Sequence, residues 1–387
     1  MIPRYSPSYN FKDLIISLGQ SAGKSPLSIL QWKLSKMYGV KHVFLFNKAR
    51  TALYVLLKAY NCPGDVILPA YNCIVVPEAI LYAGYLPKFV DIELNSFNMR
   101  IDAVRNSITP TTTVILATHQ FGIPCNIEEM IELRQEKEIL LIEDAAAALG
   151  ATYNNRLVGT FGDATILSFD SRKVLSGGTG GALLVKDDFL ANKVHNFVRN
   201  IHSTDPSLFL FGKCLAQKIL TTPNLYKFVY FVYKLLYGED MFKVIKPQKD
   251  MPAHFLRLCS KFAAILTLNE LAKIHLNLRT RKIIAQIYFN NLADHSQIKI
   301  PKILNKSSPS WIMFPIRIEK KYDFYKWMQS KGVDVSWNFR YVCTDSFLQE
   351  EFPNAKKAAH TVLGLPVYPS LSTQSAHYIS KIAQSFK

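Results

Sequence analysis

The stretch from Ile139 to Val185 reads ILLIEDAAAALGATYNNRLVGTFGDATILSFDSRKVLSGGTGGALLV. It contains short apolar runs that are typical of buried β-strands, at 138–144 (EILLIED), 164–169 (ATILSF) and 181–185 (GALLV). Polar residues lie at the ends of two of these runs. Asp144 ends the first run, and Ser168 lies at the end of the second, a few residues before Lys173. A glycine-rich loop then leads to the third run, so a lysine lies between a strand end and a loop of glycines.

The same alternation of strands and helices extends upstream. We predict further strands at 66–69 (VILP), 87–92 (PKFVDI) and 113–118 (TVILAT), and helices at 49–60, 75–84 and 126–138. This order predicts an α/β fold with a mostly parallel sheet and helices on both faces. Ligands of such sheets bind outside the carboxyl ends of the strands. We therefore expect Asp144 and the segment 168–173 to face one crevice.

The length of 387 residues, 49% of them apolar, fits a folded protein of about two domains. Beyond residue 250 the pattern changes to a long helix at about 255–292, an apolar run at 311–318, and helices at 321–331 and after 372. We predict three regions: a large domain at 1–202, a helical insertion at 203–250, and a long helix with a smaller α/β C-terminal domain at 251–387.

The formal charge of +17 favours an acidic partner, such as nucleic acid, anionic lipid or a phosphorylated substrate. The lysines are spread along the whole chain and no nucleic-acid motif accompanies them, so we do not expect nucleic-acid binding. The six cysteines form no metal-binding pair and no disulfide framework, which predicts a reducing, cytoplasmic location and no metal site. The N-terminal residues lack the unbroken apolar stretch of an export signal, and no run is long enough to span a bilayer.

The segment 208–238 (LFLFGKCLAQKILTTPNLYKFVYFVYKLLYG) differs from the rest of the chain. It has four lysines, eight Phe or Tyr residues and no acidic residue, and Pro223 divides it into two helical halves. One interpretation is a pair of helices buried against a dimer partner or the small domain. The other is a basic amphipathic pair that lies on a membrane or holds a lipid-like substrate.

Three roles are open to Lys173: a phosphate ligand in a glycine-rich loop, a solvated surface lysine, or an amine in covalent chemistry. The loop lacks the order of glycine, lysine and hydroxyl residue found in phosphate-binding NTPases. The predicted helix that begins near Arg50 offers free N–H groups to a phosphate, and the Ser168 hydroxyl adds a donor. Asp144 would hold a protonated ring nitrogen, and Lys173 would form a Schiff base with an aldehyde. These are the requirements of pyridoxal 5′-phosphate.

The block 139–185 resembles the DegT/DnrJ/EryC1/StrS family of sugar aminotransferases, which depend on pyridoxal phosphate. Other segments share the resemblance: GDVILPAYNCIVVPEAILYAGYLPKFVDIE (64–93), THQFGIPCNIEEM (118–130), FPIRI (314–318), GVDVSWNF (332–339) and LPVYP (365–369). The resemblance covers about 40–200 and 255–385, which is nearly all but the anomalous segment. It implies fold type I, like aspartate aminotransferase, and a homodimer with its sites at the subunit interface.

The resemblance also implies roles for single residues. Lys173 would carry the cofactor, Asp144 would pair with its pyridine nitrogen, and Ser168 would hold its phosphate together with the backbone of Thr51 and Ala52. The amine of Lys173, once freed, would move a proton as a base and then as an acid. The implied reaction transfers an amino group, expected from glutamate, to a keto group of a nucleotide-linked deoxysugar for a surface glycan or a glycosylated metabolite.

The chain departs from the family pattern at several positions beside the implied site. They are Ala147, where Gln or His is frequent; Thr179, for an acidic residue; Phe255, for an Asn that reaches the partner's cofactor; Asn338, for a His; and Cys73, for a Phe, with Tyr71 as a neighbouring substitute. These changes favour retained cofactor chemistry with an altered substrate or dimer contact. A retained cofactor with a lost or changed reaction is the rival hypothesis.

Some residues keep two interpretations. His119 is a packed scaffold residue or a contact to the cofactor ring and substrate, and Arg50 is a phosphate contact or an outer surface residue. Glu143 faces away from Asp144 by strand alternation and is expected to be structural. For the protein as a whole, one alternative is a related enzyme that takes a lipid-linked or hydrophobic carbonyl substrate through 208–238 at the inner membrane. A second is a regulator without catalysis, which would not need Lys173.

Overall fold

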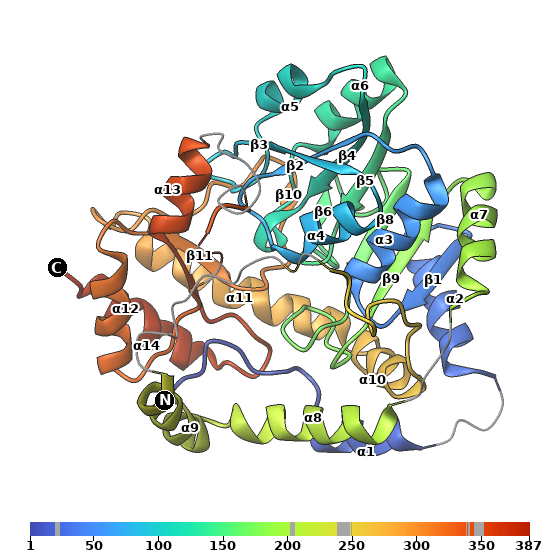
Figure 1. Ribbon diagram of the computed structural model, residues 1–387. Helices are drawn as coiled ribbons and strands as arrows, with labels where there is room; N and C mark the ends of the chain where they lie inside the picture. Colours follow the sequence, from blue (N-terminus) through green and yellow to red (C-terminus); the bar gives the residue numbers. More distant parts are fainter. Residues whose placement is uncertain are drawn as a thin grey trace.

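The fold is built on a seven-stranded sheet with the strand order β1-β9-β8-β5-β4-β2-β3 (Figure 1). We analysed a computed structural model, which describes residues 1–19, 24–201, 206–237, 248, 250–337, 339, 341–343 and 352–387. The strands are β1 (His42–Phe46), β2 (Asp65–Pro69), β3 (Leu86–Val90), β4 (Thr112–Thr118), β5 (Leu140–Asp144), β8 (Ala164–Ser168) and β9 (Gly181–Val185). All six strands predicted for this part of the chain are present.

The sheet is mostly parallel. β3, β2, β4, β5 and β8 pair in parallel, and β9 is antiparallel to both of its neighbours, β8 and β1. This confirms the predicted α/β class. β1 was not predicted, although its first four residues alternate, with Val43 and Leu45 more buried than His42 and Phe44, as a half-buried strand requires.

Helices cover both faces of the sheet. Successive side chains of a strand point to opposite faces, and β9 shows it: Leu183 and Val185 join the cluster under one set of helices, while Ala182 and Leu184 join the cluster under another. The first face carries α3 (Ala49–Tyr60), α4 (Val75–Tyr82) and α7 (Asp188–Val198). The second carries α2 (Pro26–Tyr38), α5 (Ile101–Ser107), α6 (Ile127–Lys137) and α10 (Lys261–Leu271).

A second unit follows α10. It contains α11 (Ile274–Leu292), β11 (Phe314–Arg317), α12 (Lys321–Ser330), α13 (Pro353–Thr361), β12 (Val362–Leu365) and α14 (Thr373–Gln384), with β11 and β12 antiparallel. The start of the chain runs beside this unit, because Ile2 pairs with Val333. The short strands β6 (Thr152–Tyr153), β7 (Arg156–Leu157) and β10 (Ser307–Ser308) form a small separate sheet, and η1 (Gln120–Gly122) follows β4.

The prediction of one long helix at about 255–292 is wrong. α10 begins only at Lys261, where the Ser260 hydroxyl accepts a hydrogen bond from the N–H of Ala263. The residues before it are drawn to the sheet instead, since the N–H of Cys259 donates to the carbonyl of Leu45 at 3.2 Å. A second break separates α10 from α11 at Lys273, whose φ and ψ of −104° and 4° are not helical. Tertiary pairing with β1 thus overrides the local helical pattern.

Three helices lie along one edge of the molecule, at the bottom of Figure 1: α1 (Phe11–Leu18), α8 (Ser207–Leu220) and α9 (Pro223–Tyr237). α8 and α9 are the predicted pair, separated at Pro223. α8 packs on α1 and α10, and Tyr9, Leu14, Leu210 and Cys214 meet Phe262 and Leu266 there. Across the described ranges, no helix combines the length and the apolar character that crossing a bilayer requires.

Candidate active site at the carboxyl ends of β5 and β8

Asp144 and Ser168 are the last residues of two neighbouring parallel strands, β5 and β8. Parallel strands end at the same edge of a sheet, so both side chains lie at the carboxyl edge, as the sequence predicted. Ser168 is buried. The chain turns directly after it, with the N–H of Lys173 donating to the carbonyl of Asp170 at 2.9 Å. This turn brings a half-buried Lys173 to the same edge.

The carboxyl of Asp144 is held ready for a positive partner. Burial by surrounding protein raises the pKa of Asp144, and the N–H of Ala146 and the charge of Lys173 oppose that shift only in part. The N–H of Ala146 donates to Oδ1 of Asp144 at 3.0 Å and fixes the carboxyl group. A carboxylate in this setting gains from each cation that comes close to it. The charge of Lys173 thus acts on the Asp144 carboxyl at this edge of the sheet.

Cys73 belongs to the same site. Burial raises the pKa of its thiol, and the charges of Lys173, Arg172 and Asp144 act on it as well. Its side chain stays partly accessible. Tyr71, the proposed aromatic substitute, is fully buried instead, and its ring meets those of Phe121 and Phe339 edge to face. A small thiol thus lies within the electrostatic influence of Lys173 and Asp144.

The amino end of α3 provides an open set of N–H groups. Lys48 is the N-cap of this helix and makes no capping hydrogen bond with its side chain. The N–H of Ala52 donates to the carbonyl of Lys48 at 3.3 Å, so the free donors are those of the residues before it. Thr51 uses its hydroxyl elsewhere, as a donor to the carbonyl of Phe255 at 2.8 Å. Of the two backbone positions predicted for phosphate binding, Thr51 is the one whose N–H lies in the uncapped first turn.

The glycine-rich loop lies against this helix end. A Cβ atom on Gly181 would come within 2.5 Å of the backbone nitrogen of Ala49, so only glycine allows the approach. The hydroxyl of Thr179 donates to the carbonyl of Asn47 at 2.9 Å and is a fixed contact of the loop. Gly180 has a φ of +119°, which side chains rarely adopt. The glycines therefore join the loop after Lys173 to the start of α3.

Arg50 and Phe255 contact each other beside the helix end. The guanidinium carbon of Arg50 lies 5.3 Å from the centre of the Phe255 ring, a cation–π contact. The Nε atom of Arg50 is buried and has no hydrogen-bond partner among the residues that the structure describes. The contact links two positions that sequence analysis treated separately, one as a phosphate ligand and one as a departure from the family pattern.

His119 and Glu143 form a buried network behind the site. Nε2 of His119 lies 3.2 Å from Oε2 of Glu143, and the N–H of Cys125 donates to Nδ1 at 3.1 Å. Nδ1 therefore carries the lone pair and Nε2 the proton. Glu143 also accepts from the N–H groups of Gly159, Phe161 and Gly162, each at 2.7 Å. Both ring nitrogens of the fully buried His119 are occupied, which fits the scaffold interpretation, and Glu143 is structural, as expected.

The ionisation of Glu143 follows from these contacts. Burial alone would raise the pKa of Glu143, but the hydrogen bonds from His119, Gly162 and Gly159 outweigh it and lower the pKa. The carboxylate thereby fixes the GTFGD segment (159–163) that leads into β8. Glu143 positions the strand that ends in Ser168.

Lys48 and Asp170 are charged residues near Lys173 that the sequence patterns did not indicate. Lys48 is half-buried; burial lowers its pKa, and the charge of Asp170 opposes that shift. Burial would raise the pKa of Asp170, but Arg172 and Lys48 lower it. The signal available in the sequence was a lysine directly before a predicted helix start. Asn338, a predicted substrate contact, lies outside the described residues.

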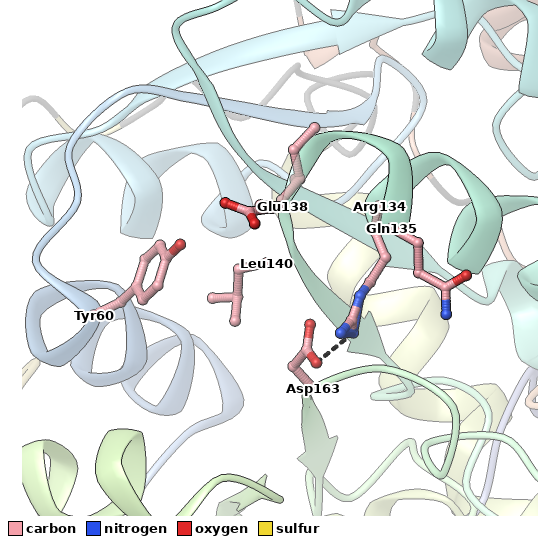
Figure 2. A pocket seen from close by; sticks show the side chains of 7 residues that line it. Tyr60, Arg134, Gln135, Glu138, Leu140 and Asp163 are labelled. Atoms are coloured by element: carbon pink, nitrogen blue, oxygen red, sulfur yellow. Dashed lines mark hydrogen bonds and ion pairs between the residues drawn. The ribbon is translucent and has the colours of Figure 1, made fainter.

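A surface pocket lies at another edge of the sheet. Figure 2 shows Arg134 and Asp163 joined by an ion pair in a depression that Tyr60, Glu138 and Leu140 also line. Leu140 is the first residue of β5, whereas Asp144 is the last. The pocket therefore lies at the amino edge of the sheet, opposite the candidate site. Its ion pair is a support for β8, because Asp163 also accepts from the N–H of Leu141 at 2.9 Å.

Comparison with known proteins supports the assignment of the site to a family. The model of the DegT/DnrJ/EryC1/StrS aminotransferase family matches residues 27–209 and 237–384. GDP-perosamine synthase of Vibrio cholerae is 23% identical over 100% of this chain and 99% of its own length. The dTDP-4-amino-4,6-dideoxy-D-glucose transaminase of Shigella dysenteriae is 24% identical over 92% and 89%.

A solved structure has the same fold. TlmJ, an aminotransferase from Streptoalloteichus hindustanus, matches with a TM-score of 0.79 and 20% identity over 100% of this chain and 98% of its own. The family match includes β5, β8, the glycine-rich loop and the start of α3, and it omits 210–236, which is most of α8 and α9. The chain belongs to the DegT/DnrJ/EryC1/StrS aminotransferase family.

Proposed function

We propose that this aminotransferase uses pyridoxal 5′-phosphate to move an amino group from glutamate to a keto group of a nucleotide-linked deoxysugar. The observation that carries the proposal is the position of Asp144 at the carboxyl end of β5, beside the parallel strand β8, after which the chain turns to Lys173, whose charge acts on the Asp144 carboxyl. An uncapped helix end lies across the glycine-rich loop from them. One amine, one carboxylate and one anion seat are the three groups that the cofactor requires.

The residues fit the cofactor. The raised pKa of Asp144 reflects a carboxyl that lacks a sufficient positive partner, and a protonated pyridine nitrogen would supply one. The N–H groups in the first turn of α3 and the hydroxyl of Ser168 would hold the phosphate. The buried Nε of Arg50, which has no partner within the described part of the chain, is a further donor close to that turn. When bound, pyridoxal phosphate supplies an aldehyde that takes up the amino group and a ring that delocalises negative charge.

Each residue then has one task in the reaction. Lys173 would hold the cofactor covalently at rest, and its amine, when released, would take the proton from the substrate carbon and return it at the neighbouring position. Asp144, when ionised, would hold a protonated ring nitrogen. Glu143 and His119 hold the strands that carry these groups. Cys73 leaves more room over the ring than a phenyl group would.

The substrate class is proposed from the relatives. Curated relatives act on sugars linked to nucleotides, as the names GDP-perosamine synthase and dTDP-4-amino-4,6-dideoxy-D-glucose transaminase state. A phosphorylated substrate also suits a chain with a formal charge of +17. We further propose a cytoplasmic homodimer that serves the synthesis of a surface glycan or a glycosylated metabolite. The departures at Ala147, Phe255 and Asn338 would then set the sugar or the partner contact.

The test has two steps. The purified holoenzyme is first reduced with borohydride, and peptide mass spectrometry locates the fixed cofactor, expected on Lys173. The unreduced enzyme is then mixed with glutamate, which should convert the bound cofactor to its amine form with a change in absorbance. Keto-sugar nucleotides are added one by one, and the substrate should reverse the change. A cofactor fixed on another lysine, or no response to any amino donor, would contradict the proposal.

A further inference from the structure

We propose that α1, α8 and α9 form a surface that binds anionic lipid bilayers, here called the lipid-facing edge. It is made of the outward sides of three helices, α1 (Phe11–Leu18), α8 (Ser207–Leu220) and α9 (Pro223–Tyr237). They lie together along one edge of the molecule, at the bottom of Figure 1. The proposal is independent of the reaction proposed above.

The outward sides carry large apolar side chains. On α9, Phe228, Phe231 and Leu235 are 64%, 63% and 74% exposed, and their spacing of three and four residues places them in one stripe. The same spacing recurs on α1, and the edge as a whole exposes Phe11, Ile15, Ile16, Leu18, Leu208, Phe209, Ile219, Leu220, Phe228, Phe231, Leu235 and Leu236. Exposed large apolar side chains that gather on neighbouring helices indicate a binding surface.

The inward sides are fixed to the body of the protein. Gln217 of α8 accepts a hydrogen bond from the Ser171 hydroxyl at 2.7 Å, and Cys214 fills the space next to Gly178. On α9, the hydroxyl of Tyr226 donates to the buried Asp334 at 2.5 Å. The helices therefore present their apolar stripes outward on a fixed frame.

The charge on the edge selects the partner. Lys227 and Lys234 are exposed and each directly precedes a stripe residue, Phe228 and Leu235, so they flank the stripe on one side. Residues 206–237 contain four lysines and neither Asp nor Glu. An amphipathic helix with apolar and aromatic residues on one side and lysines beside them suits the boundary of an anionic membrane.

A second copy of the chain suits the edge less well. In a two-fold dimer the same patch meets itself, so the lysines of one α9 would lie near those of the other. The described residues of α8 and α9 offer no carboxylate to pair with them, and like charges across an interface are costly. The family match also leaves out 210–236, so this part is additional to the shared aminotransferase frame.

The experiment measures partition of the full-length holoenzyme onto vesicles by flotation. Vesicles of phosphatidylcholine alone are compared with vesicles that also contain phosphatidylglycerol, at low and at high salt. We expect binding to the anionic vesicles that falls as salt rises. The variant Lys227→Gln/Lys234→Gln should bind about tenfold or more weakly, and Phe228→Ser/Phe231→Ser/Leu235→Ser should lose binding at both salt levels.

Matched controls change equally exposed residues elsewhere. Leu86 and Leu276 are 63% and 68% exposed, and the double change to Ser should leave binding intact. Lys58→Gln/Lys282→Gln controls for net charge, since both lysines are exposed on other helices. Conversion of the cofactor by glutamate should be unchanged in every variant, which separates this proposal from the catalytic one.

Two results would overturn the proposal. One is equal flotation of the wild-type protein with both kinds of vesicle, or with neither. The other is a wild-type oligomer that dissociates in the Phe228→Ser/Phe231→Ser/Leu235→Ser variant, measured by light scattering, with no vesicle binding by the wild type. That second result would assign the edge to a second copy of the chain.

Discussion

The carboxyl edge of the sheet and the lipid-facing edge differ in which groups they bury and which they expose. At the carboxyl edge polar groups are buried and tied down, as in Glu143 with its four hydrogen-bond donors. At the lipid-facing edge apolar groups such as Phe228 stay exposed on the outward sides of the helices. The family match covers the first and omits most of the second. Hydrogen bonds thus hold the side chains of the carboxyl edge in fixed positions, whereas the exposed side chains of the lipid-facing edge are left to contact what lies outside the protein.

Replacing Lys173 should have the largest effect. Lys173→Ala should lower the amino transfer rate by about a thousandfold or more, because the proposed mechanism has no other group to carry the cofactor and the proton. Steady-state rates and the visible absorbance of the enzyme measure it. Lys58→Ala, on the exposed side of α3, is the control and should stay fully active. A Lys173→Ala enzyme with near-normal turnover would remove the carboxyl edge from the mechanism.

Replacing Asp144 should weaken cofactor binding but leave the apoprotein equally or more stable. Burial raises the pKa of Asp144, so its ionised form disfavours the folded apoprotein above that pKa. Asp144→Asn apoprotein should melt at the same temperature or higher at neutral pH, yet bind pyridoxal phosphate tenfold or more weakly.

The pH dependence of cofactor affinity tests whether the ionised form of Asp144 favours binding. In the wild type, affinity should fall as pH drops through the pKa of Asp144, because the protonated carboxyl no longer attracts the pyridinium. The variant should lack this dependence. Asp102→Asn, at an exposed carboxylate, serves as the control. An unchanged pH profile in Asp144→Asn would refute the pairing.

Disrupting the network behind the site should cost stability. Glu143→Gln removes a buried carboxylate that three backbone N–H groups need, a loss of about 3 kcal/mol of unfolding free energy. The lowered pKa of Glu143 means that its contribution is complete above the unfolded value of about 4.3 and disappears as pH falls through the folded pKa. Chemical denaturation at several pH values should show this loss. Glu319→Gln, at a 77% exposed side chain, should change little.

The smallest effect is expected behind the lipid-facing edge. Tyr226→Phe removes the hydroxyl that binds Asp334, which keeps its contact to Nε of Arg4 at 3.2 Å. We expect the free energy of local opening of α9 to fall by about 1 kcal/mol, which should appear as faster amide exchange in α9 alone. Tyr54→Phe, whose hydroxyl has no hydrogen bond to another described residue, is the control. Faster exchange throughout the sheet would show that α9 supports the whole fold.

Much of the large domain could be predicted from sequence, because buried parallel strands are short apolar runs with clear ends. Strand β9 was predicted with its observed bounds, Gly181–Val185, and helix α3 with its bounds, Ala49–Tyr60. The long helix failed because residues before Ser260 gain more from pairing with β1 than from continuing a helix. Propensity is local, whereas that pairing joins segments far apart in the chain.

The candidate site divides in a similar way. The sequence placed Asp144, Ser168 and Lys173 at one edge, because strand ends follow from strand assignments. The sequence did not indicate that both ring nitrogens of His119 form hydrogen bonds, with Glu143 and Cys125. It also did not indicate the cation–π contact between Arg50 and Phe255. Those contacts depend on how separate segments dock, which no spacing in the chain records.

The sequence by itself determined the α/β class, the position of Asp144 and Lys173 at one edge of the sheet, and the presence of an unusual basic and aromatic segment. Each of these depends on residue type and short spacing, which the chain states directly. Only the tertiary structure decided that α8 and α9 turn Cys214 and Tyr226 inward and Phe228 outward. The two interpretations of that segment differ in what lies against it, and burial is a property of packing between distant segments.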